Sequence, residues 1–250
     1  NLVVQNAVTV TSGTLTFDDR ASLLQTNNVT NALGVYSGGN SGNIIYRRNT
    51  MPVYQVDYTY WSMPVYPQTV NGFSPTSALA YTYNSSLATP AWQGTTFSTS
   101  LIPGKGYIVR APSSQPFGPL DGPPSTVLTT FSAVPNNGNI SAPVSCGTMG
   151  SGTQDDKWNL LGNPYPSAID ADLFITNAIN KDLMTGALYF WTHNTAIKDN
   201  GSAYVYSSND YAVYTLTGGT SGTPVKTPAG SGGDAPSGQI AAGVAFFVKS

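Results

Sequence analysis

His193 is the only histidine in the chain, so it is the first residue to consider for acid–base chemistry. An imidazole can act as a general base near neutral pH, but a hydrolytic triad also needs a poised nucleophile and an orienting carboxylate. The sequence has no Gly-x-Ser-x-Gly motif, and Ser41 and Ser151 lie in Gly-rich stretches that are typical of turns. We therefore expect no catalytic residue and no enzyme activity, with His193 as an ordinary side chain at the end of a strand.

Aspartate supplies all twelve acidic residues, and three pairs of aspartates lie close together in the sequence. The pairs are Asp18 with Asp19, Asp155 with Asp156, and Asp170 with Asp172. A hydrolase that uses paired carboxylates is the weakest hypothesis, because adjacent residues on a strand point to opposite faces. Calcium accepts carboxylate and backbone oxygens from loops, although none of the pairs has the spacing of a regular calcium loop. The candidate calcium ligands are Asp155, Asp156, Asp170 and Asp172, and the alternative is that they cap helices and turns.

Aromatic residues recur at spacings of two or three along several segments. A period of two places the rings on one face of a sheet, where a buried row forms core and an exposed row stacks on sugar rings. Core is the favoured interpretation for most of them. The candidate carbohydrate-binding residues are Trp92, Tyr81 and Tyr83, and Trp92 is the most exposed candidate because Pro90 and Gly94 place it in a turn.

The composition favours strands and tight turns. The 250 residues include 15 Tyr, 26 Gly and 18 Pro but no Glu, which is a helix-favouring residue. Only 9% of the residues are charged and the net charge is −2, so the chain lacks the basic stripe that nucleic-acid binding requires. Cys146 is the single cysteine, which excludes an intrachain disulfide, and no apolar run is long enough to span a membrane.

The segment Trp158–Phe174 begins as an apolar strand and stops at Gly162-Asn163-Pro164, where the proline cannot continue a helix or a central strand. This segment resembles the "WNLIGNPYPS" segment of large secreted and cell-surface proteins of Bacteroidetes. Further segments fit the same family in order: Asp57–Val65, Pro103–Pro112, Tyr189–Asn194, Asn209–Tyr214 and Ile240–Ser250. The resemblance implies export by the type IX secretion system, an extracellular or cell-surface location, and an adhesin or gliding-associated role without a shared catalytic motif.

Two parts of the chain share one pattern. Tyr60–Pro67 parallels Leu160–Pro166, Ala78–Tyr83 parallels Ala187–Trp191, and Pro103–Arg110 parallels Ala242–Lys249. The offset grows along the chain, from 100 (Pro64 and Pro164) to 139 (Gly104 and Gly243). The pattern predicts a duplicated aromatic β unit whose second copy carries an insertion, which we place in a hairpin from Tyr204 to Tyr214 and in the Gly-rich run after it.

The N-terminal residues alternate in polarity as short strands do. Leu2, Val4, Val8 and Val10 are the apolar positions, and turn residues separate the strands. This rhythm fits either the end of a β-solenoid or the first strands of a sandwich. Exposed edge strands can pair with other chains, so these four residues are the candidate self-assembly strand.

The sequence therefore predicts an all-β chain, arranged as a β-sandwich or jelly-roll-like module of two related aromatic units. The expected parts are an N-terminal β segment (1–48), a first β unit (49–112), a Pro/Gly-rich linker with one strand (113–152) and a second β unit (153–250). One short helix is expected from Asp170 to about Leu183, with Asp170 as its N-cap. Because the chain begins at Asn1, we expect a processed or excised form of a longer protein.

The function that this sequence favours is that of a non-enzymatic structural or adhesive module on the bacterial surface. Low charge leaves little repulsion between copies, so self-association into a fibre through edge strands is the expected partner interaction. The alternative is a carbohydrate-binding module of a secreted polysaccharide-degrading protein. No cofactor is expected apart from the calcium considered above.

Overall fold

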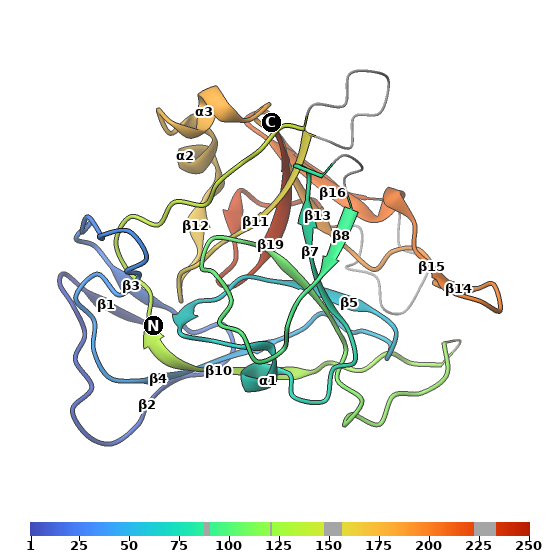
Figure 1. Ribbon diagram of the computed structural model, residues 1–250, viewed down its shortest axis with the longest axis horizontal. Coiled ribbons are helices and arrows are strands. Elements are labelled where there is room, and N and C mark those ends of the chain that lie inside the picture. The colour runs from blue at the N-terminus through green and yellow to red at the C-terminus, as the bar shows by residue number, and fades with distance from the viewer. Residues whose placement is uncertain (88–90, 121, 148–156, 223–233) are drawn as a thin grey trace.

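The structure, a computed structural model, describes residues 1–87, 91–120, 122–147, 157–222 and 234–250 (Figure 1). Within these ranges the strands form six sheets of two to five strands, and the α-helices are short. The predicted all-β class is confirmed. The strands are divided among several sheets, and the arrangement as a sandwich or jelly roll remains a prediction.

The N-terminal region is built from two segments that stack in parallel. The pairings are β1 (Leu2–Val4) on β3 (Leu23–Gln25), Thr9 on Ser41, and β2 (Leu15–Phe17) on β4 (Ile44–Asn49). Each strand of the first segment therefore lies beside the next segment in the same direction, as successive coils of a solenoid do. Of the two alternatives left open by the sequence, this arrangement favours solenoid coils over sandwich strands.

One long strand joins this coil to the rest of the molecule. β10 (Leu128–Pro135) pairs antiparallel with β4 on one side and with β6 (Val65–Tyr66) on the other. The expected single strand of the linker thus becomes the central strand of a four-stranded sheet. Directly after β10, the Asn136 side chain donates hydrogen bonds to the carbonyls of Met63 (2.7 Å) and Pro164 (2.9 Å), which belong to the two proline turns.

The two aromatic units contain sheets with the same strand order. In the first unit the order is β5 (Tyr58–Trp61), β9 (Tyr107–Arg110), β7 (Ala80–Asn84) and β8 (Ala91–Gly94). In the second unit it is β11 (Trp158–Gly162), β19 (Ala245–Lys249), β13 (Leu188–Trp191), β16 (Tyr211–Thr215) and an extra edge strand, β17 (Gly218–Thr220). Successive neighbours in both sheets are antiparallel.

The register of the two sheets also repeats. Tyr58 pairs with Arg110 in the first sheet as Trp158 pairs with Lys249 in the second. On the other side of the sheet, the pair Tyr83–Trp92 corresponds to the pair Trp191–Tyr211. The offsets of 100 and 139 that the sequence suggested therefore describe structurally equivalent positions, which supports a duplication.

The two units exchange reciprocal contacts. Bridges join Trp61 of the first unit to Val244 of the second, and Leu161 of the second to Lys105 of the first. The backbone amides that follow, those of Ser62 and Gly162, donate to the carbonyls of Gly243 (2.7 Å) and Gly104 (3.0 Å). Because equivalent residues make both sets of contacts, the units are related by an approximate two-fold axis. Gly104 and Gly243 both have positive φ, which explains a glycine in each of these turns.

The insertion in the second unit is divided differently from the prediction. Tyr204 lies in a hairpin of β14 (Lys198–Asp199) and β15 (Tyr204–Val205), whereas Tyr214 lies in β16, which pairs with β13 and β17. The predicted hairpin from Tyr204 to Tyr214 is therefore wrong. A 3₁₀ turn at Ser208–Asp210 lies between β15 and β16 and separates the hairpin from the main sheet. The Ser207 hydroxyl stabilises the start of this turn by accepting a hydrogen bond from the Asn209 amide (3.2 Å).

The helical content also differs from the prediction of one helix. Asp170 does cap a helix, since its carboxylate accepts from the Leu173 amide at 3.0 Å, but this helix, α2 (Ala171–Thr176), ends early. Asn177 adopts an extended conformation and its side chain accepts from the Ile179 amide at 3.0 Å, so a separate helix, α3 (Asn180–Leu183), follows. A third helix, α1 (Val70–Phe73), was not predicted from the sequence.

Asn163 holds the proline turn of the second unit together. Its buried side-chain amide donates to the carbonyls of Ser167 (2.8 Å) and Ile240 (2.9 Å), and its carbonyl accepts from the Tyr165 amide (2.9 Å). These bonds lie beside the short pair of β12 (Ile169–Asp170) and β18 (Gln239–Ile240). A fully paired buried amide of this kind fixes one conformation of the turn, which explains the Gly-Asn-Pro sequence.

Candidate functional site

An open pocket lined mainly by aromatic side chains lies where the two units meet. Its volume is about 410 Å³. Its walls are Tyr83, Trp92, Trp158, Tyr189, Tyr211 and Phe247, completed by Ser208 and Val213. Tyr83 and Trp92 come from β7 and β8 of the first unit, whereas the other rings come from the second unit. We refer to this group of eight residues as the open aromatic pocket.

The rings of the pocket meet edge to face. The ring centroids of Tyr83 and Trp92 lie 5.5 Å apart, with an angle of 80° between the ring planes. For Trp158 and Tyr189 the centroid distance is 4.7 Å and the angle is 82°. Phe247 touches both groups, at 5.4 Å from Tyr83 and 6.0 Å from Trp158. Edge-to-face contacts are the favourable arrangement for aromatic quadrupoles, and they make a concave cage rather than a flat platform.

A cation lies over one wall of the pocket. The Lys249 ammonium is 5.4 Å from the centroid of the Trp158 ring. In the first unit the equivalent Arg110 guanidinium lies 5.5 Å from the Tyr58 ring. Each unit therefore repeats a cation–π pair at the end of its edge strand, which fixes the ring and places a positive charge beside it.

Tyr211, one wall of the pocket, is joined through its hydroxyl to the buried Tyr60. The Tyr60 and Tyr211 hydroxyls are 2.7 Å apart, and the Tyr60 ring stacks on Trp191 at 5.7 Å. Burial raises the pKa of Tyr211 to about 12 and raises that of Tyr60 well above its ordinary value. Both phenols are therefore neutral at physiological pH, and they cannot supply an anionic group to the pocket.

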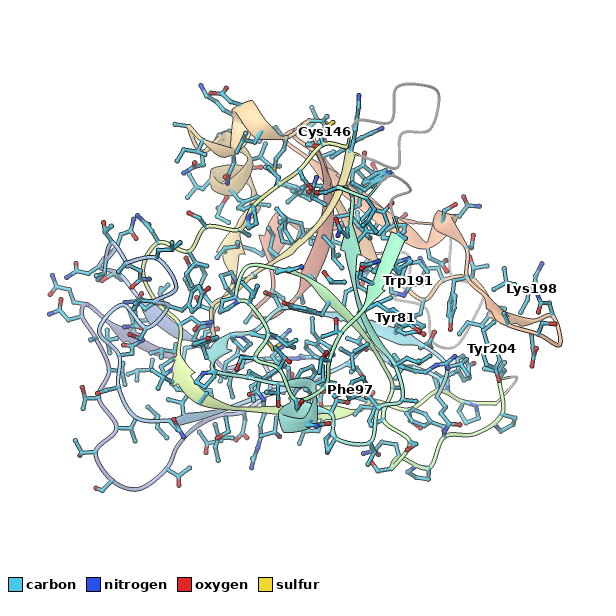
Figure 2. The ribbon with its side chains drawn as sticks, in the orientation of Figure 1. Tyr81, Phe97, Cys146, Trp191, Lys198 and Tyr204 are labelled. Atoms are coloured by element: carbon cyan, nitrogen blue, oxygen red, sulfur yellow. The ribbon has the colours of Figure 1, made fainter. Side chains whose placement is uncertain are left out.

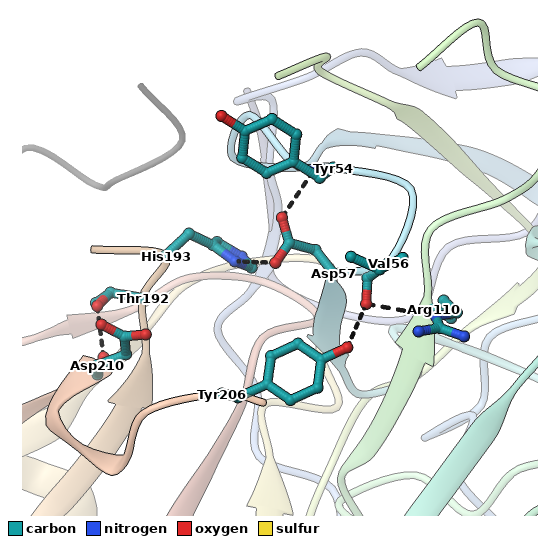
Figure 3. A network of polar contacts seen from close by, with 8 residues as sticks. All are labelled: Tyr54, Val56, Asp57, Arg110, Thr192, His193, Tyr206 and Asp210. Carbon is teal, nitrogen blue, oxygen red and sulfur yellow. Dashed lines mark hydrogen bonds and ion pairs between the residues drawn. The ribbon is translucent and has the colours of Figure 1, made fainter. Parts of the chain in front are cut away.

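A polar network on the other side of the interface links the insertion to the first unit (Figure 3). The Tyr206 hydroxyl donates to the Val56 carbonyl at 2.6 Å, and Arg110 Nε donates to the same carbonyl at 3.4 Å. His193 Nδ1 lies 3.2 Å from Asp57, and the other carboxylate oxygen of Asp57 accepts from the Tyr54 amide at 2.7 Å. The insertion is thus attached to the first unit at two points.

His193 therefore has a carboxylate partner that its position in the sequence did not reveal. Asp210 is also buried nearby, with its backbone carbonyl accepting from the Thr192 amide at 2.9 Å and from the Thr192 hydroxyl. Burial raises the pKa of Asp210, while hydrogen bonds from Thr195 and the charge of His193 act in the opposite direction. The His193, Asp57 and Asp210 side chains do not line the open aromatic pocket, so we assign this cluster to holding the units together.

The candidate carbohydrate-binding residues are divided between two places. Tyr83 and Trp92 line the open aromatic pocket, and Trp92 is 38% exposed. Tyr81 instead pairs with Tyr58 at 6.2 Å, in the region of Trp191 (Figure 2). The sequence thus identified two rings of the pocket, but it did not reveal that the remaining walls come from the second unit.

Of the four candidate calcium ligands, the structure describes Asp170 and Asp172, and each has a hydrogen-bond partner within the fold. Asp170 caps α2, and the Asp172 carboxylate accepts a hydrogen bond from the Tyr214 hydroxyl at 2.9 Å. Asp155 and Asp156 lie outside the described residues. Within the described ranges no group of three or more His, Cys, Asp or Glu side chains is placed to hold a metal ion.

The candidate self-assembly residues lie in and beside the first strand of the coil. Leu2 is exposed in β1, but Val4, Val8 and Val10 are half-buried against the coil's own core. Val3, which the sequence analysis did not single out, is 62% exposed. Leu2 and Val3 are therefore the exposed apolar side chains of this strand.

Some functional features had a detectable signal in the sequence, and others did not. The two cations follow equivalent apolar strands, as Val109-Arg110 and Val248-Lys249, so the repeat could have identified them. Tyr206 and His193 lie in the connection between β13 and β16, which is longer than the equivalent connection of the first unit. Their contacts with Val56 and Asp57 join residues about 140 to 150 positions apart, and no local pattern encodes such a contact.

The fold and the pocket together define an all-β protein made of a parallel coil and a duplicated aromatic sheet. The chain belongs to the family described as a domain of unknown function, DUF8693, whose model matches residues 1–250. No curated protein and no solved structure matches the chain. Within the described residues, the helices are too short and too polar to cross a bilayer. Cys146 is exposed and unpaired with another cysteine.

Proposed function

We propose that this chain is a non-catalytic structural module of a secreted or cell-surface bacterial protein, and that it associates through the open edge of its N-terminal coil. The setting rests on the resemblance to Bacteroidetes surface proteins described above. The association is supported by one structural observation: within the described residues, no strand pairs with the outer edges of β1 and β2.

Both strands of the first coil segment are edge strands within the described part of the chain. β1 pairs only with β3, and β2 pairs only with β4. Since each pairing is parallel and directed to the next segment, the outer edges of β1 and β2 face the same way, away from the molecule. A row of backbone donors and acceptors of this kind can pair with a strand of another chain.

Val3 presents its backbone to that open edge. The backbone groups of the flanking residues Leu2 and Val4 point toward the second segment of the coil. The Leu2 amide donates to the Ser22 carbonyl (2.9 Å), and the Val4 carbonyl accepts from the Thr26 amide (3.0 Å). In a strand, alternate residues bond to opposite sides, so the Val3 amide and carbonyl point outward. The exposed side chains of Leu2 and Val3 add apolar area that a second chain would cover.

The charge balance is compatible with association between copies. With a net charge of −2 over 250 residues, long-range repulsion between identical chains is weak. Edge protection by lysine or proline is a common way to prevent pairing, and the first eight residues contain neither.

The test replaces the outward amide. Val3→Pro removes one donor from the open edge, and proline is tolerated there because the strand is extended and its internal bonds use Leu2 and Val4. We expect the sedimentation coefficient of the wild-type chain to rise with protein concentration, and that of Val3→Pro to stay at the monomer value.

Val3→Thr is the matched control, since it keeps the amide and the strand propensity and should still associate. Thermal unfolding of all three chains checks that the coil remains folded. A wild-type chain that is monomeric at every concentration would refute the proposal, and so would a Val3→Pro chain that associates as the wild type does.

A carbohydrate-binding module is the second candidate function. It is supported by the exposure of Trp92 beside Tyr83 at the mouth of the open aromatic pocket. Glycan-array binding that is lost on Trp92→Ala would support it, and an array without specific binding would argue against it. Trp92→Phe is the control, because it retains an aromatic face on which a sugar ring could stack.

A further inference from the structure

The two-fold relation gives the open aromatic pocket a counterpart on the other side of the interface. The equivalent pairs are Trp158 with Tyr58, Tyr189 with Tyr81, and Tyr83 with Trp191. The counterpart therefore has an aromatic residue at each of these three wall positions. At the position of Phe247 the counterpart has Ile108, and the two sites also differ in what occupies them.

The ring geometry supports this equivalence. The pair Trp158–Tyr189 meets at 82° in the open pocket, and the equivalent pair Tyr58–Tyr81 meets at 63°. On the opposite wall, Tyr83 and Trp92 lie 5.5 Å apart, while the equivalent rings Trp191 and Tyr211 lie 5.1 Å apart. Both sites are thus built from two edge-to-face pairs that face each other.

Tyr206 occupies the counterpart. Its ring lies 5.7 Å from Tyr58 and 6.4 Å from Trp191, so it contacts one ring of each wall. Its hydroxyl donates to the Val56 carbonyl at 2.6 Å. The residue equivalent to Val56 lies outside the described part of the chain.

A second tyrosine, Tyr204, lies two residues before Tyr206 and packs against Arg110, the cation of the same site. The Arg110 guanidinium is 5.3 Å from the centroid of the Tyr204 ring as well as 5.5 Å from that of Tyr58. The equivalent cation at the open pocket, Lys249, lies over Trp158 alone among the described rings. Figure 2 shows Tyr204 on the hairpin that projects from this side of the molecule.

The difference in occupancy follows from the length of one connection. Between β13 and β16 the chain runs through residues 192–210, which carry the hairpin and Tyr206. Between β7 and β8 the equivalent connection is only residues 85–90. Residues 85–90 contain no tyrosine, so the equivalent connection of the first unit carries no Tyr-x-Tyr pair.

We propose that the open aromatic pocket binds an extended segment of a partner protein that carries two aromatic side chains two residues apart, as Tyr204 and Tyr206 do in the counterpart. One ring enters between Trp158 and Tyr83, and the other rests on Lys249. This is a binding site separate from the edge of the N-terminal coil.

The lining favours an aromatic side chain over a sugar. Ser208 is the single aliphatic hydroxyl among the lining residues that the structure describes, and the Tyr211 hydroxyl is already bonded to Tyr60. Few polar groups among the described lining residues could pair with the hydroxyls of a sugar that face the walls, whereas an aromatic side chain needs no such partners there. The volume of about 410 Å³ is ample, since a cavity of about 150 Å³ holds a benzene ring.

The first experiment uses the acetylated and amidated pentapeptide that copies Ala203–Ser207. Binding is followed by the NMR signals of the four tryptophan indole groups, assigned with single Trp→Phe variants. We expect saturable shifts at Trp158 and Trp92 and none at Trp61, which is buried in another core. The dissociation constant should be roughly millimolar, as befits a small ligand with two ring contacts.

Control peptides and variants define the contacts. Replacing both tyrosines of the peptide with alanine should abolish binding, and Lys249→Gln should weaken binding by about threefold, as loss of one cation–π contact predicts. Lys198→Gln is the matched control, because Lys198 lies on the hairpin and should have no effect. Val3→Pro should bind the peptide as the wild-type chain does, which separates this proposal from association through the coil.

A second measurement uses the filled site. Tyr206→Ala empties the counterpart, so this variant should bind two peptides instead of one, with the second reported by the Trp191 signal. The proposal is overturned if the peptide gives no saturable shift at Trp158 and Trp92. It is also overturned if an oligosaccharide shifts those signals while the peptide does not, or if the peptide binds only the emptied site of Tyr206→Ala.

Discussion

Tyr60 and Tyr211 illustrate how single residues connect the two units. Their hydroxyls are in contact across the interface, and both rings belong to the aromatic cluster between the sheets. Burial raises the pKa values of both phenols, because a charged phenolate would lose its hydration there. The consequence is a dependence of stability on alkaline pH.

We expect the stability from this pair to be fully present below pH 10 and to be lost as the pH rises toward 12. In the unfolded chain a tyrosine ionises near pH 10, whereas Tyr211 in the folded protein ionises at about 12. Ionisation therefore favours the unfolded state across this interval. Ultraviolet titration should show tyrosines that ionise late, and Tyr211→Phe should remove one of them. Titration of all 15 tyrosines near pH 10 in the folded protein would contradict the prediction.

His193 shows what could not be predicted at this scale. Its place two residues after β13 agrees with the predicted strand-end position. Its partner Asp57 could not be predicted, because the pair depends on the docking of the insertion against the first unit. A single histidine and twelve scattered aspartates give no sequence signal for one particular contact.

At the scale of elements, β5 and β11 approach each other where the two-fold axis passes. The equivalent residues Ser62 and Gly162 are in direct contact there, and a Cβ added at Gly162 would overlap the Cβ of Ser62. Ser62 is fully buried, so it cannot move aside. One of the two strands must therefore have a residue without a side chain at this position.

Gly162→Ala should lower the free energy of unfolding by about 1–3 kcal/mol, because overpacking forces the strands apart. Ser62→Gly removes the opposing Cβ, so the double variant should lose less stability than the sum of the two single variants. The measurement is chemical denaturation of all four chains as a double-mutant cycle, with an expected coupling of about 0.5–3 kcal/mol. Additive losses would show that the two positions do not share this contact.

Several elements could be predicted because their signals are local. The Gly-Asn-Pro turn, the cap at Asp170 and the strand after the Pro-rich stretch follow from residue types at fixed spacing. The break between α2 and α3 was missed because asparagine occurs both within helices and as a cap. Which of the two conformations Asn177 adopts depends on its tertiary surroundings, which the sequence does not show. Strand pairing in the insertion was assigned wrongly because several short polar and aromatic runs there have equal propensity.

At the scale of the whole molecule, the repeat was predictable and its geometry was not. Offsets of 100 and 139 identified equivalent strands, and the register of both sheets agrees with them. The reciprocal bridges, the parallel coil and the walls of the open aromatic pocket depend on contacts between residues far apart in the sequence. Two of the three rings proposed for carbohydrate binding, Tyr83 and Trp92, do line that pocket. Alternating aromatic residues indicate one face of a sheet, but they do not show what packs against that face.

The crossed pairing of Trp61 with Val244 and of Leu161 with Lys105 is the arrangement that two separate identical subunits would make. Within one polypeptide the two copies need not be identical, so Tyr206 packs between the aromatic walls on one side, while the equivalent walls on the other side line the open aromatic pocket. An assembly of two identical subunits would present the same face twice, whereas this chain presents two different faces to its surroundings.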